Sequence, residues 1–166
     1  MKTLYFDCAM GAAGDMLMGA LSELHPDRDG FLARLNRALA GRAVVSAAPD
    51  SKCGISGTHI SVSINGHEEV EEPDGHCDVG HHHHHHTSIS EIFAFLDHAE
   101  ADSAVIADAK AVYTLLADAE SRVHGRPIEN IHFHEIGSLD ALADILGVSM
   151  LIHELAPDKI VCSPIN

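Results

Sequence analysis

The sequence has few basic residues, with 10 Lys and Arg against 25 Asp and Glu, and its formal net charge is −15. A surface with this excess of negative charge repels nucleic-acid phosphates and anionic lipid headgroups. We therefore expect neither nucleic acid nor a membrane as a partner. Cations are expected to be attracted instead.

Cysteines and long apolar runs are also scarce. The 4 cysteines are Cys8, Cys53, Cys77 and Cys162, and no two of them form a CxxC pair. The absence of disulfide-type spacing and of a secretory signal indicates the reducing cytoplasm. No segment approaches a run of about 18 uncharged apolar residues, so the sequence predicts no membrane span.

The chain does have enough apolar residues, 46% of 166, for one domain with a substantial core. Hydrophobic periodicity predicts strands over Thr3–Cys8, Val44–Ala48, Thr58–Ile64, Asn130–Phe133 and Lys159–Cys162. It predicts helices over Asp15–Leu24, Gly30–Ala40, Ser88–His98, Ser103–Val123 and from a Ser138 cap to Leu155. The expected fold is therefore α/β: a single compact domain with a short mixed sheet, flanking helices and a disordered His-rich loop over residues 65–87.

An unbroken run of six histidines lies in the interior of the chain: His81, His82, His83, His84, His85 and His86. Imidazole is a common ligand of transition metals, so a flexible run offers many interchangeable ways to bind such an ion. Expression tags sit at chain ends, so the interior position favours a native run over an engineered insertion. Because protons compete with metal for imidazole, capture should weaken below about pH 6.5.

Other ligands lie close to this run. His76 and Cys77 add an imidazole and a thiolate, and neighbouring Asp and Glu residues add carboxylates. Without apolar periodicity the segment cannot fix a coordination geometry, so we expect it to capture, store or deliver metal and not to catalyse a reaction. The alternative is a solvated low-complexity loop that binds divalent ions incidentally.

A second metal-ligating pattern is His132-Phe133-His134-Glu135. Strand alternation places His132 and His134 on one face, where their rings could hold one metal ion. The spacing by itself is modest evidence, because such pairs arise by chance in a chain with 15 histidines.

The helix that follows carries two acidic residues, Asp140 and Asp144, one turn apart among apolar or small neighbours. A buried ionised carboxylate costs several kcal/mol unless a metal, a hydrogen bond or an Arg offsets it. Asp140 also fits a structural role, because the helix dipole stabilises an acidic residue in the first turn. Asp144 lies deeper in the helix, which favours a functional role.

A glycine-containing loop, from Asp7 to Asp15, joins the first strand to the first helix. Gly11 and Gly14 allow backbone amides to approach an anion, so the phosphate of a nucleotide-like ligand could bind there. The loop matches neither a Walker A motif nor a dinucleotide fingerprint. Because Asp7 and Asp15 repel phosphate, a site bridged by a metal is favoured over bare anion binding.

Together these segments resemble the N-terminal part of the nickel insertion proteins that complete the nickel-pincer nucleotide cofactor of lactate racemase. The matching residues span nearly the full chain: Asp7-Cys8, Gly11, Gly14-Asp15-Met16, Gly19-Ala20-Leu21, Gly54-Ile55-Ser56-Gly57, the His-rich loop, Ala119-Glu120, Val123-His124-Gly125, His132 to Gly137, Asp140 and Asp144. The stretch from Val123 to Asp144 is the most specific part. A histidine-rich loop also occurs in hydrogenase and urease nickel chaperones.

The resemblance implies a metallochelatase, a lyase by reaction class, that inserts nickel into pyridinium bis-thiocarboxylic acid mononucleotide with CTP hydrolysis. It implies Ni²⁺ as the metal and a C-terminal domain that binds CTP with Mn²⁺ or Mg²⁺. Residues 1–166 form the N-terminal domain only, so complete turnover is expected to need that C-terminal half as a partner. Lactate racemase apoenzyme is a further possible partner, no catalytic residue is assigned, and a homo-oligomer is possible.

Three functions from different classes remain open. The leading one is the nickel-supplying module of this chelatase. The second is passive nickel or zinc storage, or metallochaperone activity, in which the domain only displays the loop. The third is a metal-dependent hydrolase, but those folds usually place the His pair on an early barrel strand, with more histidines on later strands. Here the pair comes late and only His153 follows it.

Overall fold

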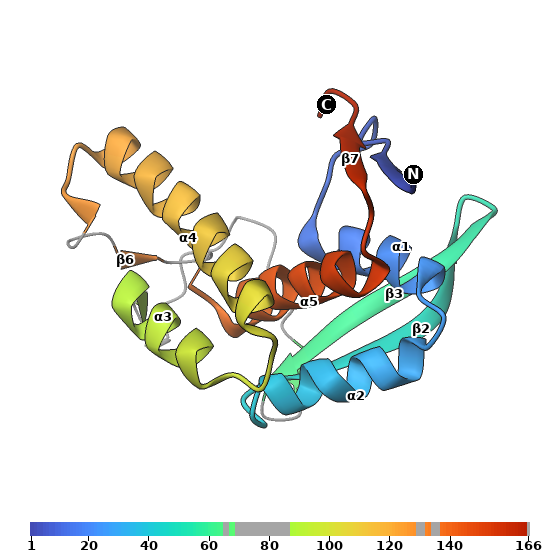
Figure 1. The fold of residues 1–166 in the computed structure, drawn as a ribbon, viewed down its shortest axis with the longest axis horizontal. Helices are drawn as coiled ribbons and strands as arrows, with labels where there is room; N and C mark the ends of the chain where they lie inside the picture. The colour runs from blue at the N-terminus through green and yellow to red at the C-terminus, as the bar shows by residue number, and fades with distance from the viewer. Residues whose placement is uncertain (65–66, 69–86, 129–131, 134–136, 166) are drawn as a thin grey trace, which may run out of the picture.

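The computed structural model describes residues 1–64, 67–68, 87–128, 132–133 and 137–165 (Figure 1). Its helices are α1 (Gly14–Leu24), α2 (Arg28–Ala38), α3 (Ile89–His98), α4 (Ser103–His124) and α5 (Leu139–Leu155). Its strands are β1 (Thr3–Phe6), β2 (Val44–Lys52), β3 (Ile55–Ile64), β4 (His67–Glu68), β5 (Thr87–Ser88), β6 (His132–Phe133) and β7 (Lys159–Cys162). None of the described helices is long and apolar enough to cross a membrane.

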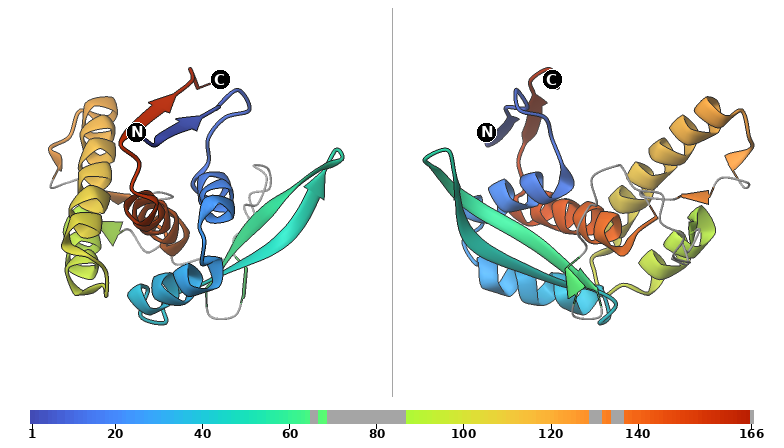
Figure 2. Two further views of the ribbon diagram at one scale, coloured as in Figure 1. Left: turned by 45° about the vertical axis from the view of Figure 1, so that its right-hand side comes forward. Right: turned by 180° about the vertical axis from the view of Figure 1, so that it is seen from behind.

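Helix α5 lies at the centre of the molecule and organises the rest. It packs against α1 and α2 on one side and against α4 on the other, and α1 in turn packs on β3 (Figures 1 and 2). Seven residues of α5 are buried, as expected for a helix enclosed on most sides. Buried side chains from all five helices and from β2, β3 and β6 form one hydrophobic cluster, so the predicted α/β class and single domain are confirmed.

The strands form small separate sheets instead of one mixed sheet. β1 and β7 pair in parallel, β2, β3 and β4 form an antiparallel sheet, and β5 pairs with β6 antiparallel. Both kinds of pairing are present, as a mixed sheet requires, but they do not join. The reason is that α1 and α5 lie between the β1–β7 pair and the β2–β3 hairpin (Figure 2).

Some element boundaries differ from expectation. The β2–β3 hairpin continues past the predicted ends to the pair Lys52 and Ile55, with Cys53 (φ 53°) and Gly54 (φ 80°) between them. Two positive φ values in succession are typical of the tight two-residue hairpin turn. The extra residues are exposed, so apolar alternation could not reveal them. Pairing also enters the expected loop, because β4 pairs with the last two residues of β3.

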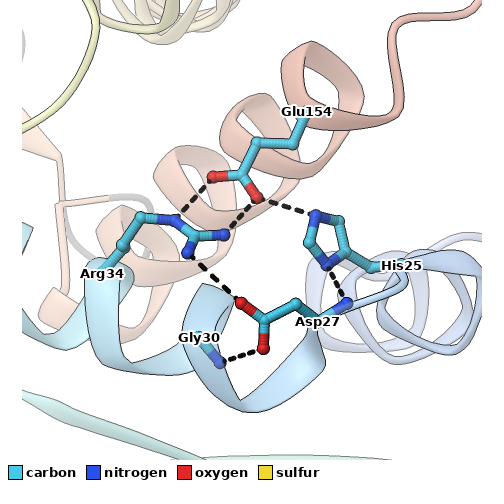
Figure 3. A network of polar contacts seen from close by, with 5 residues as sticks. All are labelled: His25, Asp27, Gly30, Arg34 and Glu154. Atoms are coloured by element: carbon cyan, nitrogen blue, oxygen red, sulfur yellow. Dashed lines mark hydrogen bonds and ion pairs between the residues drawn. The ribbon is translucent and has the colours of Figure 1, made fainter.

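A polar network joins the C-terminal end of α5 to the turn between α1 and α2 (Figure 3). Arg34 donates two hydrogen bonds to Glu154, with Nε 3.0 Å from Oε1 and Nη2 2.6 Å from Oε2. His25 Nε2 lies 2.8 Å from the same carboxylate. Asp27 lies 3.7 Å from Arg34 Nη1 and also accepts a hydrogen bond from the Gly30 amide, which caps α2 and explains why this helix begins before Gly30.

We expect the change Glu154→Ala to lower the free energy of unfolding by about 1.5 kcal/mol, because it removes a bidentate pair and leaves Arg34 and His25 without their shared acceptor. Urea denaturation measures the change. The matched control is Asp97→Ala, which removes a single contact to Lys110 at 2.6 Å from a carboxylate that is 59% exposed. That control should stay within about 0.5 kcal/mol, and equal losses in both variants would contradict a structural role for the network.

Candidate functional site

The carboxylate of Asp144 lies at the point where α5 crosses the beginning of α1. The residue before α1, Ala13, offers no side-chain cap. Asp144 occupies this position instead: a Cβ atom on Gly14 would lie only 2.5 Å from Asp144 Oδ2, so the contact requires glycine. The backbone N–H of Asp15 donates a hydrogen bond to the Asp144 carboxylate. Asp144 therefore acts on α1 as an N-terminal cap supplied by a distant helix.

Capping does not account for the electrostatics of Asp144. Burial raises the pKa of this carboxyl, the negative charges of Asp140 and Asp15 raise it further, and the hydrogen bond from the Asp15 amide lowers it. The balance is a pKa of about 7, against 3.8 for an ordinary aspartate. Burial and repulsion thus outweigh the cap, and Asp144 holds a proton about half of the time near neutral pH.

Two polar atoms in this region have no hydrogen-bond partner among the described residues: Asp144 Oδ1 and the hydroxyl oxygen of Tyr113. Tyr113 is fully buried on α4. Burial raises its pKa and the charge of Asp144 raises it further, so the two groups are electrostatically coupled. Buried polar atoms without partners are uncommon, and each calls for a partner such as an ordered water or an ion.

Sequence reasoning did not identify Tyr113. It falls on the buried stripe of α4 with Val105, Ala109 and Ala117, a spacing that indicates a core position. The available signal was chemical: a tyrosine on a stripe of small and aliphatic residues carries a hydroxyl that needs a partner.

Strand β6, which carries His132, lies close to the beginning of α5. Phe133 is 2% exposed, and its ring centroid lies 6.2 Å from that of Tyr113. In the turn before α5, a Cβ on Gly137 would lie 2.9 Å from the Phe133 Cβ and 3.0 Å from the Thr87 Cβ. Ser138 then caps α5 as predicted, accepting a hydrogen bond from the Ala141 amide at 3.1 Å. The fold therefore holds together the elements on which the predicted ligands Asp140, Asp144 and His132 lie.

Most of the predicted metal ligands lie outside the described residues: His76, Cys77, His81, His82, His83, His84, His85, His86, His134 and Glu135. Of His132, only the backbone is described. Within the described part of the chain, no three His, Cys, Asp or Glu side chains lie close enough to hold a metal ion together. Asp15, Asp140 and Asp144 interact through their charges but do not form a complete coordination shell. The assignment of all these metal ligands stays a prediction.

Two glycines of the predicted anion-binding loop already make contacts within the fold. Gly11 has φ +88° and donates a hydrogen bond from its amide to the Cys8 carbonyl at 3.0 Å, which forms a turn. Gly14 begins α1 and contacts Asp144. Because a phosphate at this helix end would meet the carboxylates of Asp15 and Asp144, its binding needs an intervening cation. This favours the metal-bridged interpretation of Asp7, Gly11, Gly14 and Asp15, which also stays a prediction.

Comparison with known proteins also points to a protein that handles nickel. The sequence model of the family described as "Nickel insertion protein" matches residues 4–166. The chain is 36% identical to the pyridinium-3,5-bisthiocarboxylic acid mononucleotide nickel insertion protein of Acetivibrio thermocellus, and 34% identical to proteins of the same name from Akkermansia muciniphila and Geobacillus kaustophilus. The alignments cover 99 to 100% of this chain but 39% of each relative. No solved structure matches significantly.

Proposed function

Because the chain belongs to the nickel insertion protein family, we propose that it is the nickel-handling N-terminal module of an enzyme that inserts nickel into pyridinium-3,5-bisthiocarboxylic acid mononucleotide. In this proposal the enzyme is a CTP-dependent metallochelatase of the lyase class and works in the cytoplasm. A C-terminal half binds CTP with Mn²⁺ or Mg²⁺, and the finished cofactor is delivered to lactate racemase. The chain spans 39% of the length of its relatives, which leaves room for such a half in those proteins.

The observation that supports a nickel site best is the state of Asp144. Its carboxylate is partly buried, repelled by Asp140 and Asp15, and has one buried oxygen without a partner among the described residues. A divalent cation bound there would replace the proton, relieve the repulsion and give Oδ1 a partner. Among the described residues, the charges that shift the Asp144 pKa are those of Asp140 and Asp15, and both are negative.

The remaining predicted residues divide into groups. Asp140 and Asp144, together with His132, His134 and Glu135, are proposed to hold the nickel ion that is to be inserted. Asp7, Gly11, Gly14 and Asp15 are proposed to hold the phosphate of the nucleotide through the cation. His76, Cys77 and the run His81–His86 are proposed to collect nickel and release it quickly, because ligands without a fixed geometry exchange easily.

The alternative function is passive storage of nickel or zinc, and removal of the histidine run distinguishes it. We expect a variant with His81–His86 replaced by alanines to lose most of its bound nickel but to keep the site near His132 and His134, measured by equilibrium dialysis. A variant with alanines at His132 and His134 should lose that site and keep the others. A storage protein would instead lose nearly all of its metal with the run and would be unaffected by the second variant.

The activity itself is measured by reconstitution. The chain is mixed with the metal-free nucleotide, nickel, CTP and a C-terminal half from a full-length relative, and lactate racemase activity is then followed. Activation that disappears when the chain is omitted would support the proposal, and unchanged activation would end it.

A further inference from the structure

A pair of cysteines lies outside the site described above. Cys8, two residues after the end of β1, and Cys162, the last residue of β7, are separated by 154 positions in sequence, yet their Sγ atoms are 3.5 Å apart. Cys8 is 4% exposed, whereas Cys162 is exposed. Figure 1 shows how the pairing of β1 with β7 brings these two ends of the chain together.

Backbone contacts fix the two cysteines on both sides. Phe6 is the partner of Cys162 in the parallel pair, and the Ser163 amide donates to the Phe6 carbonyl at 2.9 Å. The Cys8 amide donates to Ser163 Oγ at 2.8 Å. The turn closed by Gly11 holds the Cys8 carbonyl. The strand pairing thus fixes the backbones of the two cysteines, and the sulfur atoms meet at the end of one rotatable side-chain bond each.

The separation of the sulfur atoms distinguishes between the two reactions open to a dithiol. A disulfide needs an S–S distance of about 2.05 Å, so the atoms would have to approach by about 1.5 Å. Two thiolates bound to one ion at about 2.3 Å lie about 3.3 Å apart at a right angle and about 3.8 Å apart at the tetrahedral angle. The observed 3.5 Å lies between these two values. In the metal-free chain this is the spacing of a thiol–thiol hydrogen bond, and the same spacing suits two thiolates on one metal ion.

We infer that Cys8 and Cys162 form a dithiol site that binds a borderline divalent metal ion through both sulfur atoms. Each thiol loses its proton to solvent as the ion binds. That the ion is nickel rests on the proposed function; the existence of the site does not.

The site leaves coordination positions open. No third His, Cys, Asp or Glu of the described residues completes a metal cluster, so water or a ligand would occupy the other positions, as in metal sites that exchange their contents. Asp7 lies near enough for its negative charge to raise the Cys8 pKa, after the larger effects of the Cys162 contact and burial. A cation is favoured by the same charge. The relatives are named for a substrate with two thiocarboxylic groups, and sulfur donors suit a borderline ion.

The test uses Co²⁺ and Ni²⁺ with the reduced chain in which His81–His86 are replaced by alanines, so that the run does not compete. We expect a sulfur-to-metal charge-transfer absorption at a stoichiometry of one ion per chain. It should be lost in Cys8→Ser and in Cys162→Ser and kept in Cys53→Ser, the control at the exposed hairpin turn. All of these proteins also carry Cys77→Ser, because the Cys77 thiolate is itself proposed to collect nickel and would add its own absorption.

A second measurement covers the case in which Cys8→Ser does not fold. In the unsubstituted chain, nickel should protect Cys8 and Cys162, but not Cys53, from alkylation by iodoacetamide, read by mass spectrometry. An absorption that survives Cys162→Ser, equal alkylation with and without nickel, or rapid disulfide formation with glutathione disulfide and no metal absorption would each overturn the inference. Because these readouts need neither nucleotide nor CTP, failure of the dithiol site and failure of the insertion activity are separate outcomes.

Discussion

Replacing Asp144 with asparagine is expected to stabilise the folded chain at pH 8 by roughly 2 kcal/mol and to leave its stability at pH 4 almost unchanged. The shift of the Asp144 pKa from 3.8 to about 7 corresponds to about 4 kcal/mol if it applies in full. Because the carboxyl is only partly buried, solvent screening reduces the effect and we take about half. Asparagine accepts the same hydrogen bond from the Asp15 amide without the charge.

The direction of the pH dependence follows from which state holds the proton. Between pH 4 and 7 the folded chain keeps the Asp144 proton and the unfolded chain has released it, so the free energy of unfolding falls as the pH rises and levels off above about 7. The Asp144→Asn variant has no carboxyl proton to release, so its free energy of unfolding should not fall in this way between pH 4 and 7. Urea denaturation at the two pH values measures the difference, with Asp118→Asn on α4 as a control expected to behave alike at both.

The same variant should be defective in function. Without the carboxylate, the site can neither exchange its proton for nickel nor use Oδ1 as a ligand, and we expect reconstituted nickel insertion to fall by at least about tenfold. Stability that rises while activity falls is the signature of a charge retained for function. A stabilised variant with full activity would show that Asp144 only caps α1.

The change Gly14→Ala is expected to cost about 3 kcal/mol of the free energy of unfolding. The new Cβ would lie 2.5 Å from Oδ2, 2.6 Å from Cβ and 2.7 Å from Cγ of Asp144, so either α1 or the Asp144 side chain must move. Overpacking of a tight contact typically costs about 1 to 3 kcal/mol, and here the crowded atoms belong to a short side chain with little freedom to withdraw.

Gly57→Ala is the matched control, because a Cβ on Gly57 meets no atom within 4 Å. Its effect should stay within about 0.5 kcal/mol. If Gly14→Ala pushes the carboxylate away from the helix end, the loss of stability between pH 4 and 7 should also shrink. An alanine variant with unchanged stability and an unchanged pH profile would contradict the contact.

The sequence predicts the elements of this fold well. All five helices and the strands β1 and β7 lie within two residues of the ranges expected from hydrophobic period and cap residues, and Ser138 caps α5 as anticipated. These features are local, since a helix face or a cap is encoded by residues a few positions apart. The prediction of a single mixed sheet was wrong, because strand pairing depends on how the helices pack between the strands.

The candidate site was predictable only in part. The position of Asp144 in an apolar helix indicated a buried carboxylate, and the structure gives it a raised pKa and an oxygen without a partner among the described residues. Its contact with Gly14, its coupling to Tyr113 and the approach of Cys8 to Cys162 join residues far apart in sequence. No spacing rule reports such contacts, because they arise from the tertiary packing of α1, α4, α5, β1 and β7.

The pairing of β1 with β7 also bears on the order in which the chain acquires its form during synthesis. β1 is synthesised long before its partner strand, Lys159–Cys162, and has no strand to join until that segment follows. Such a distant pairing forms late, after the loop-closure entropy of nearly the entire domain has been overcome. The thiols of Cys8 and Cys162 therefore meet only after this late pairing has formed.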